Sequence, residues 1–409
     1  MKRLFAVPAL AVLAALFVSC GGGTAQSGGA AYHIGICTGT VSQSEDDLRG
    51  AEELIARYGR AAEGGIIQHI TYPDNFMEQQ EVTISQIVAL ADDPKMKAII
   101  VNQAVPGTAE AFKRVREKRD DILLFAGEAH EDPLVIQGAA DLAISADFIS
   151  RGYTIPWAAK QLGAKTFVHI SFPRHMSYET LGLRRQIMEA ACNDLGIQFV
   201  FATAPDPTSD VGVAGAQQSI LEQTPQWIAQ YGKDTVFFCT NDAHTEPLLK
   251  QLLTYGGMFV EADLPSPLMG YPGALGINLS AETGDFPAIL AKVEEAVNAQ
   301  GGSNRFGTWA FSYGFSASAG LGEFAKRIID NSAQLGNLDD LYAALGEFTP
   351  GAKWNGGYYI DANTGVRAAN QVLIFMDTYI MGSPGKFLPT TEQNVPEKYY
   401  QITFQQQEG

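Results

Sequence analysis

The chain has 409 residues, with 28 lysines and arginines against 45 aspartates and glutamates, for a formal net charge of −17. Apolar residues make up 46% and charged residues 18%, a composition that excludes an intrinsically disordered chain. The acidic balance argues against a nucleic-acid-binding protein, which needs a basic face to meet phosphates. Because a single core rarely grows beyond about 250–300 residues, the length predicts two core units.

The N-terminus is typical of an exported lipoprotein. A short basic segment precedes the apolar run of residues 4–18, which is shorter than the roughly 20 residues of a membrane-spanning helix. The residues FVSC at 17–20 resemble a bacterial lipobox, in which the cysteine is acylated. We therefore expect a signal peptide over residues 1–19, a palmitate-type lipid on Cys20 and a flexible tether over residues 20–31. The alternative is an ordinary signal peptide that is cut elsewhere.

Such a signal predicts a protein of the cell envelope, lipid-anchored to a membrane and facing the periplasmic or extracellular side. Cys37, Cys192 and Cys239 have apolar neighbours and no C-x-x-C spacing. We expect them to be small buried hydrophobic residues rather than disulfide partners or metal ligands.

Strand-like and helix-like segments alternate through the first half of the body. Short apolar runs predict strands at residues 32–39, 65–72, 96–101, 122–126 and 142–144. Helical spacing is found at residues 45–58, 77–91 and 108–118, and Ser44 with Asp47 forms a capping signal for the first helix. This alternation predicts a parallel sheet that is buried on both faces.

The alternation begins again after a joint near residues 147–151. Helices are predicted at residues 152–162, 178–195, 211–231 and 246–255, with strands at residues 166–170, 197–202, 235–239 and 258–262. The body therefore contains two similar α/β halves.

The last third has a different pattern. Helices are predicted at residues 285–298, 320–329 and 338–345, and late strands at residues 358–360 and 372–379. Trp309, Phe311, Tyr313 and Phe315 alternate with other residues, which favours one face of a strand or extended loop that packs on the body. The polar tail, residues 386–409, is expected to be only partly ordered.

Several stretches resemble the type I periplasmic solute-binding proteins, which include sugar binders and the nucleoside-binding lipoproteins of the basic membrane protein family. These stretches are residues 147–171, 177–197, 235–252 and 276–297, within a resemblance that covers about residues 32–300. The resemblance implies an α/β fold of two doubly wound parallel-sheet lobes joined by a hinge. Residues 301–357 depart from it.

The resemblance and the element pattern together divide the chain. The first lobe is predicted from residues 32–147 plus about 277–355, and the second from residues 148–276 plus about 356–385. Residues 386–409 form the C-terminal tail.

Candidate ligand-binding residues follow the predicted strands, because ligands of open parallel sheets bind beyond the carboxyl ends of the strands. They are Ser42, Gln43, Asn102, Gln103 and Glu128 in the first lobe, Arg174, His175, Asn241 and Asp242 in the second, and the aromatic Trp309. Each also has a structural interpretation: helix capping for Asn241 and Asp242, a salt bridge for Arg174, turn chemistry for Ser42 and Gln43, and core packing for Trp309.

The resemblance implies that the protein captures a small molecule between its lobes and passes it to an ABC-type permease in the membrane. A nucleoside, a sugar or another ring compound is the favoured ligand. An envelope sensor that signals to a membrane partner is one alternative, and an envelope hydrolase is another. We expect no enzymatic activity, no cofactor and no metal, because the histidines are scattered and no H-E-x-x-H, P-loop or G-x-S-x-G motif is present.

Overall fold

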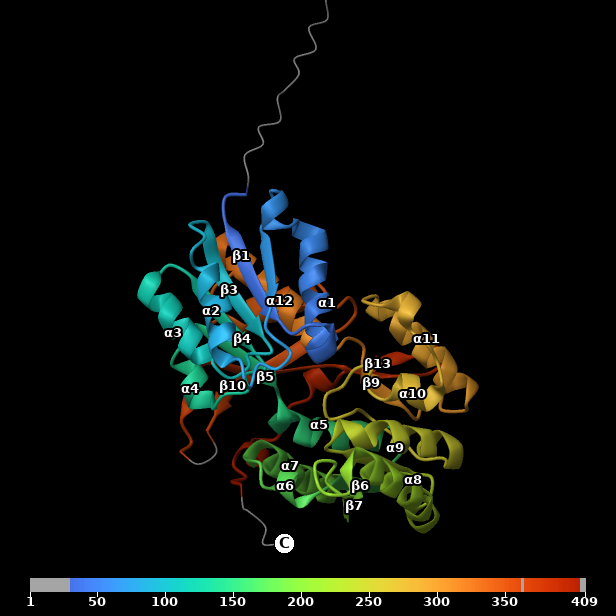
Figure 1. Ribbon diagram of the computed structural model, residues 1–409. Helices are drawn as coiled ribbons and strands as arrows, with labels where there is room; N and C mark the ends of the chain where they lie inside the picture. Colours follow the sequence, from blue (N-terminus) through green and yellow to red (C-terminus); the bar gives the residue numbers. More distant parts are fainter. Residues whose placement is uncertain (1–29, 362–363, 405–409) are drawn as a thin grey trace, which may run out of the picture.

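The computed structural model describes residues 30–361 and 364–404. The predicted signal peptide, the predicted lipidation site Cys20 and nearly all of the tether lie outside the described residues. The described part forms two lobes, each built on a mainly parallel sheet (Figure 1). The predicted α/β class with two parallel-sheet lobes is confirmed.

The first lobe contains a seven-stranded sheet in the order β10-β11-β5-β4-β3-β1-β2. Its parallel strands are β1 (His33–Thr38), β2 (Ile67–Thr71), β3 (Met96–Asn102), β4 (Leu123–Gly127), β5 (Leu142–Ala146) and β11 (Arg367–Met376), and β10 (Trp354–Ile360) runs antiparallel to β11. Its helices are α1 (Val41–Tyr58), α2 (Gln80–Leu90), α3 (Thr108–Lys118), α4 (Pro133–Gln137), α12 (Tyr313–Ile329) and α13 (Leu338–Gly346).

Alternation along each strand explains why helices cover both faces of this sheet. Ile34, Ile36 and Ile100 join the core beneath α1 and α12, whereas Ile99 and Val101 join the core beneath α2 and α3. Successive side chains of a strand point to opposite faces, so continuous apolar strands require a helical layer on each side.

The second lobe contains the parallel sheet β7-β6-β8 and an antiparallel sheet β13-β12-β9. Its strands are β6 (Thr166–Ser171), β7 (Gln198–Thr203), β8 (Thr235–Cys239), β9 (Gly307–Trp309), β12 (Thr378–Ile380) and β13 (Lys386–Leu388). Its main helices are α5 (Phe148–Gln161), α7 (Glu179–Leu195), α8 (Gly212–Tyr231), α9 (Asp242–Tyr255) and α11 (Phe286–Ala299). The predicted strand 258–262 makes only isolated bridges, which link β8 to the segment before β9.

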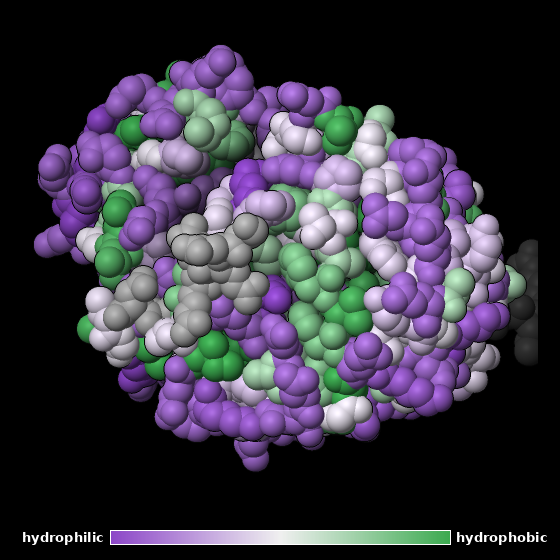
Figure 2. Space-filling model, turned by 90° about the horizontal axis from the view of Figure 1, so that it is seen from below, coloured by the Kyte–Doolittle hydropathy of each residue, from purple (hydrophilic) through white to green (hydrophobic). Residues whose placement is uncertain are grey.

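Strand β7 lies at the edge of its sheet and is only partly covered. Phe201 keeps 39% of its surface exposed, and Phe199 and Val200 are partly exposed. Seen from below, an apolar stripe crosses the second lobe where Figure 1 places β7, with polar atoms on both sides (Figure 2).

Two predicted lobe assignments are wrong. Residues 356–376 were assigned to the second lobe, but β10 and β11 complete the first sheet, where β11 pairs with β5 through Val372 and Ile144. Residues 277–299 were assigned to the first lobe, but α11 packs Val293 and Val297 against Val168 of β6. Apolar periodicity identifies an element without identifying which sheet it joins.

The aromatic segment also differs from expectation. Trp309 ends a short strand, and Tyr313 and Phe315 belong to α12, whose first turn is capped by Ser312 accepting a hydrogen bond from the Phe315 N–H. The predicted strand or extended loop is therefore wrong beyond Trp309. In the described part of the tail, which ends at residue 404, α14 (Glu397–Tyr400) packs on α5 and α7.

Tyr399 anchors the tail. Its ring is 1% exposed and stacks on Tyr153 at 5.3 Å, and its hydroxyl donates to Asp194 at 2.5 Å. We expect Tyr399→Ala to lower the free energy of unfolding by about 2–3 kcal/mol, through the lost burial and the cavity. Gln401→Ala, an exposed change in the same segment, should alter it by less than about 0.5 kcal/mol. Equal effects of the two changes in urea unfolding would contradict the anchoring role.

Three segments of the described chain cross between the lobes: the turns β5–α5, β9–α12 and β11–β12. Arg151 of α5 braces them, because its Nε donates to Glu261 at 2.7 Å and Glu261 also accepts from the Thr378 hydroxyl at 3.1 Å. The Arg151 guanidinium also lies over the Trp309 ring at 5.3 Å. The buried Arg151–Glu261 pair therefore contacts residues beside all three crossings.

Candidate functional site

The carboxyl ends of the first-lobe strands point toward the second lobe (Figure 1). Side chains from these ends and from the second lobe influence one another across the space between the lobes: the charges of Asp263 and Arg151, both of the second lobe, act on the pKa of Glu128. We call this region, bounded by Asp47, Glu128, Asp242 and Asp263, the interlobe cleft.

The first-lobe wall of the cleft contains a buried polar network. Asn102, at the end of β3, is fully buried, and its Nδ2 donates to Asp47 Oδ1 at 2.9 Å and to Ser318 Oγ at 2.9 Å. Its amide nitrogen therefore ties α1 and α12 to the sheet, whereas its Oδ1 is buried with no hydrogen-bond partner among the described residues, so ligand contact by Asn102 stays a prediction. Gln103 is partly exposed at the same edge, and its backbone N–H bonds to Asp47.

Asp47 and Glu128 are two carboxyl groups of this wall whose pKa values are shifted. Burial raises the pKa of Asp47 to about 7, and the charges of Asp46 and Glu128 add to the shift. Burial likewise raises the pKa of Glu128 to about 7, although its carboxylate accepts the Ala146 N–H at 3.2 Å and a hydrogen bond from Tyr313. Two carboxyl groups of one wall therefore titrate near neutral pH.

The pKa of Asp47 predicts a pH dependence of stability. In the unfolded chain this carboxyl loses its proton near pH 4, but in the folded chain it holds the proton to about pH 7, so stability falls as pH rises through that window. Between pH 5 and pH 8, wild type should lose about 2 kcal/mol more than Asp47→Asn. Asp120→Asn, which removes an exposed charge, should keep the wild-type slope. Urea unfolding at each pH measures the difference, and identical slopes in all three proteins would contradict it.

The second-lobe wall is formed by the turns after β6 and β8. His175 Nδ1 lies 3.2 Å from Thr240 Oγ1, which bonds to Ser171 Oγ at 2.7 Å. The His175 ring packs on Phe172 with centroids 4.1 Å apart, and burial lowers its pKa. A neutral imidazole and an aromatic face are thus held at one strand end.

Asn241 and Asp242 follow β8, as the sequence indicates. The Asn241 side chain caps α9 by accepting the Ala243 N–H at 3.0 Å, which matches its structural interpretation. Asp242 is exposed in the cleft, where partial burial and the charge of Asp263 raise its pKa. Of this pair, Asp242 has the carboxylate that a ligand can reach.

Two other predicted residues, Arg174 and Trp309, have partners within the protein. Arg174 forms a bidentate pair with Asp206, with Nε–Oδ2 and Nη2–Oδ1 distances of 2.7 and 2.9 Å, which matches its salt-bridge interpretation. Trp309 is fully buried and packs edge-on against Trp354 at 6.0 Å, so the prediction that it contacts ligand is wrong. Ser42 and Gln43 are exposed in the first turn of α1, where the Gln43 side chain donates to the Asp74 carbonyl at 2.6 Å.

The sequence reasoning missed three charged residues of the cleft. Asp263 follows the apolar segment 258–262, the same signal that identified Asp242, and it pairs with the fully buried Arg184 of α7. Arg151 donates to the Ala262 and Asp263 carbonyls, each at 2.9 Å. Arg151 and Arg184 lie within helices, so the pattern of polar residues after predicted strands does not include them.

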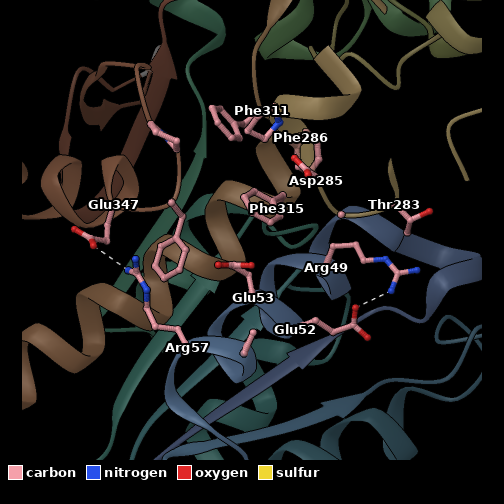
Figure 3. Close-up of a pocket in the computed structure, with 15 residues that line it drawn as sticks. Arg49, Glu52, Glu53, Arg57, Thr283, Asp285, Phe286, Phe311, Phe315 and Glu347 are labelled. Carbon is pink, nitrogen blue, oxygen red and sulfur yellow. Dashed lines mark hydrogen bonds and ion pairs between the residues drawn. The ribbon is translucent and has the colours of Figure 1, made fainter. Parts of the chain in front are cut away.

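Three hollows are lined by residues of both lobes, and the largest, of about 740 Å³, lies between the β10–β11 hairpin and the tail near Tyr399. The interlobe pocket, of about 210 Å³, is lined by residues that include Glu128, Phe148, Leu183, Ile360 and Gln371. The α1–α11 groove, of about 610 Å³, is lined by Phe286, Phe311, Phe315 and a charged rim that includes Arg49 and Arg57. In Figure 3 both arginines point to glutamates, and the pair distances are 2.7 Å for Arg49–Glu52 and 2.9 Å for Arg57–Glu347. The groove contains no predicted ligand residue, whereas the interlobe pocket contains Glu128.

Within residues 30–361 and 364–404, no group of three or more His, Cys, Asp or Glu side chains is placed to hold a metal ion. No helix in that part of the chain has the length and apolar character needed to span a bilayer. Cys37, Cys192 and Cys239 are buried free thiols, so their predicted role as small buried residues is confirmed.

The fold and the cleft define a two-lobe α/β protein whose polar side chains gather where strand ends of the two lobes meet. The chain belongs to the family described as "Protein of unknown function (DUF3798)", whose model matches residues 32–307. A second family model matches residues 318–402.

Relatives and solved structures are consistent with this assignment. Two proteins from Treponema pallidum (strain Nichols), both described as uncharacterized, are 48% and 46% identical over 216 and 211 residues. These matches cover 51% and 52% of this chain and 98% and 95% of the relatives. A crystal structure from Clostridium difficile 630, described as a proposed transcriptional regulator, has a TM-score of 0.77 at 22% identity and covers 85% of this chain and 99% of that one. This likeness shows a shared fold.

Solute-binding proteins of ABC transport systems are also found at lower scores. A sugar ABC transporter structure from Actinomyces odontolyticus ATCC 17982 has a TM-score of 0.47 at 12% identity, covering 78% of this chain and 83% of that one.

Proposed function

We propose that this chain is a lipid-anchored, extracytoplasmic solute-binding protein that captures a small molecule between its lobes and delivers it to an ABC-type permease. The interlobe cleft carries the proposal. Carboxyl groups and an imidazole approach one space from two separately folded lobes, which is the arrangement that domain closure around a ligand requires. Capture and release need no covalent chemistry, so the proposal includes no catalytic residue.

Thermal unfolding of residues 27–409 against nucleosides, bases, sugars, amino acids, amines and peptides tests capture. A ligand at 100 times its dissociation constant adds about 2.7 kcal/mol to the free energy of unfolding, enough to raise the midpoint clearly. Loss of that shift in Asp242→Asn or His175→Ala would support binding in the cleft. A shift retained in both variants would contradict it.

Lobe closure has an independent readout in the α1–α11 groove. Glu53 of α1 and Thr283 before α11 face this groove from different lobes and are exposed (Figure 3). Spin labels at Glu53→Cys and Thr283→Cys in residues 27–409 should report a changed distance when ligand binds and the lobes close. The labels attach at these two positions because the three native thiols of that fragment are buried. Binding with an unchanged distance would contradict transport by closure. Permease and ATPase genes beside this one would favour import, and a sensor-kinase gene would favour signalling.

A further inference from the structure

The interlobe pocket is built from both lobes. The first lobe contributes the ends of β4 and β5 and one face of the β10–β11 hairpin, and the second contributes the first turns of α5 and α7. Its volume of about 210 Å³ corresponds to roughly seven waters of liquid, enough for a compact organic group. A molecule in this pocket contacts both lobes at once.

A buried hydrogen-bond acceptor in this pocket lacks a donor. Gln371 of β11 lines the pocket and is 4% exposed, and its Oε1 has no hydrogen-bond partner. A buried carbonyl oxygen without a donor costs about 1–3 kcal/mol, so such groups are rare unless something else completes them. An N–H group of a ligand would remove this cost.

The charges around the pocket favour a ligand with a positively charged hydrogen-bond donor. Glu128 and Glu179 are among the lining residues, together with Glu131, whose carboxylate is taken up by the backbone N–H groups of Gly107 and Ala109 at 3.1 and 2.8 Å. The residues that line the pocket include no lysine, arginine or histidine. Glu128 accepts the Ala146 N–H through Oε2 and a further hydrogen bond from Tyr313, and because an ionised carboxylate has about four lone-pair sites it can accept another donor.

Most of the remaining lining residues are apolar, and the exceptions are the hydroxyl-bearing Ser145, Thr180 and Tyr359. Phe148 and Leu183 come from the second lobe, and Ile360 and Leu373 come from the first. Apolar walls with a few convergent polar groups are typical of a site for an organic ligand, whereas a hydrated inorganic ion needs polar groups on every side.

We propose that the interlobe pocket binds the ammonium end of a compact organic amine, with the N–H groups donating to Gln371 Oε1 and Glu128 and the hydrocarbon part packed on Phe148 and Leu183. This assignment rests on the proposed function and names the ligand class for the same cleft. A neutral isostere of the amine should bind at least tenfold more weakly, because it offers fewer donors and no charge.

Calorimetric titration of the mature chain with 2-phenylethylamine, its alcohol isostere 2-phenylethanol and the anion 3-phenylpropionate tests the assignment. We expect the amine to bind at least tenfold more tightly than either other probe. Gln371→Leu and Glu128→Gln should each lower the affinity for the amine by 10- to 100-fold. Glu78→Gln removes the same charge as Glu128→Gln but at an exposed position, and it should leave the affinity unchanged. Thermal unfolding identifies any variant that fails to fold. If Gln371→Leu does not fold, the amine affinity of Glu128→Gln tests the assignment.

Equal binding of the alcohol and the amine, or tighter binding of the carboxylate, would overturn the amine assignment. So would undiminished amine binding by a folded Glu128→Gln protein. If a ligand of another class changes the Glu53–Thr283 label distance, the proposed function stands and the amine assignment falls. If amines bind as expected and the label distance never changes, the pocket assignment stands and solute capture by closure falls.

Discussion

Replacing Arg151 by methionine should lower the free energy of unfolding by about 3–5 kcal/mol. The Arg151 and Glu261 side chains are 1% and 2% exposed, so the variant leaves the Glu261 carboxylate buried without its counter-charge. It also removes the donors to the Ala262 and Asp263 carbonyls. Urea unfolding followed by tryptophan fluorescence measures the change, because Trp309 lies directly beneath the guanidinium.

Two controls separate this effect from the loss of any ion pair. The double variant Arg151→Met/Glu261→Met should recover part of the stability, because no uncompensated charge remains buried. Lys165→Met breaks an exposed pair with Asp234 and should cost less than about 1 kcal/mol. A loss in Arg151→Met no larger than in Lys165→Met would contradict the bracing role.

The order of strands and helices could be predicted from the sequence, but the partners of the late strands could not. The helix at 108–118 and the start of α11, where the Asp285 side chain caps the first turn, follow from local signals, because capping and periodicity act within a few residues. The placement of β11 depends on Val372 meeting Ile144 across the sheet, and no local pattern encodes that pairing.

Trp309→Ala is the second change with a large expected effect, a loss of about 3–5 kcal/mol in the free energy of unfolding. The indole is fully buried between Trp354 and Arg151, and the truncation leaves a cavity where the lobes are joined. Thermal unfolding monitored by circular dichroism measures it. Trp309→Phe keeps most of the volume and should lose much less.

The same variant tests whether Trp309 serves the core or the ligand. At a temperature where Trp309→Ala is still folded, it should bind any ligand found for the cleft as wild type does, because the side chain reaches no open surface. A large loss of affinity with unchanged stability would restore the ligand role that the aromatic pattern suggested.

The candidate site was predictable only in part, and depth along the strand explains the difference. Asp242 and Asn102 give the same signal in the sequence, a polar residue after an apolar strand. Asp242 lies beyond its strand and is exposed, whereas Asn102 is the last residue of β3 and is covered by α12, a helix more than 200 residues later in the chain. The residue type shows the chemistry at a strand end, and the distant helix decides whether a ligand can reach it.

The late position of β11 has a consequence for how the protein is made. β5 ends at residue 146, but β11, which pairs with it, begins at residue 367. Nearly nine-tenths of the chain must therefore be synthesised before the sheet of the first lobe can be completed. The core strands of the second lobe, residues 166–239, emerge together and can pair at once. Because pairing between distant segments is slow, the first lobe should be the last to acquire protease resistance during synthesis.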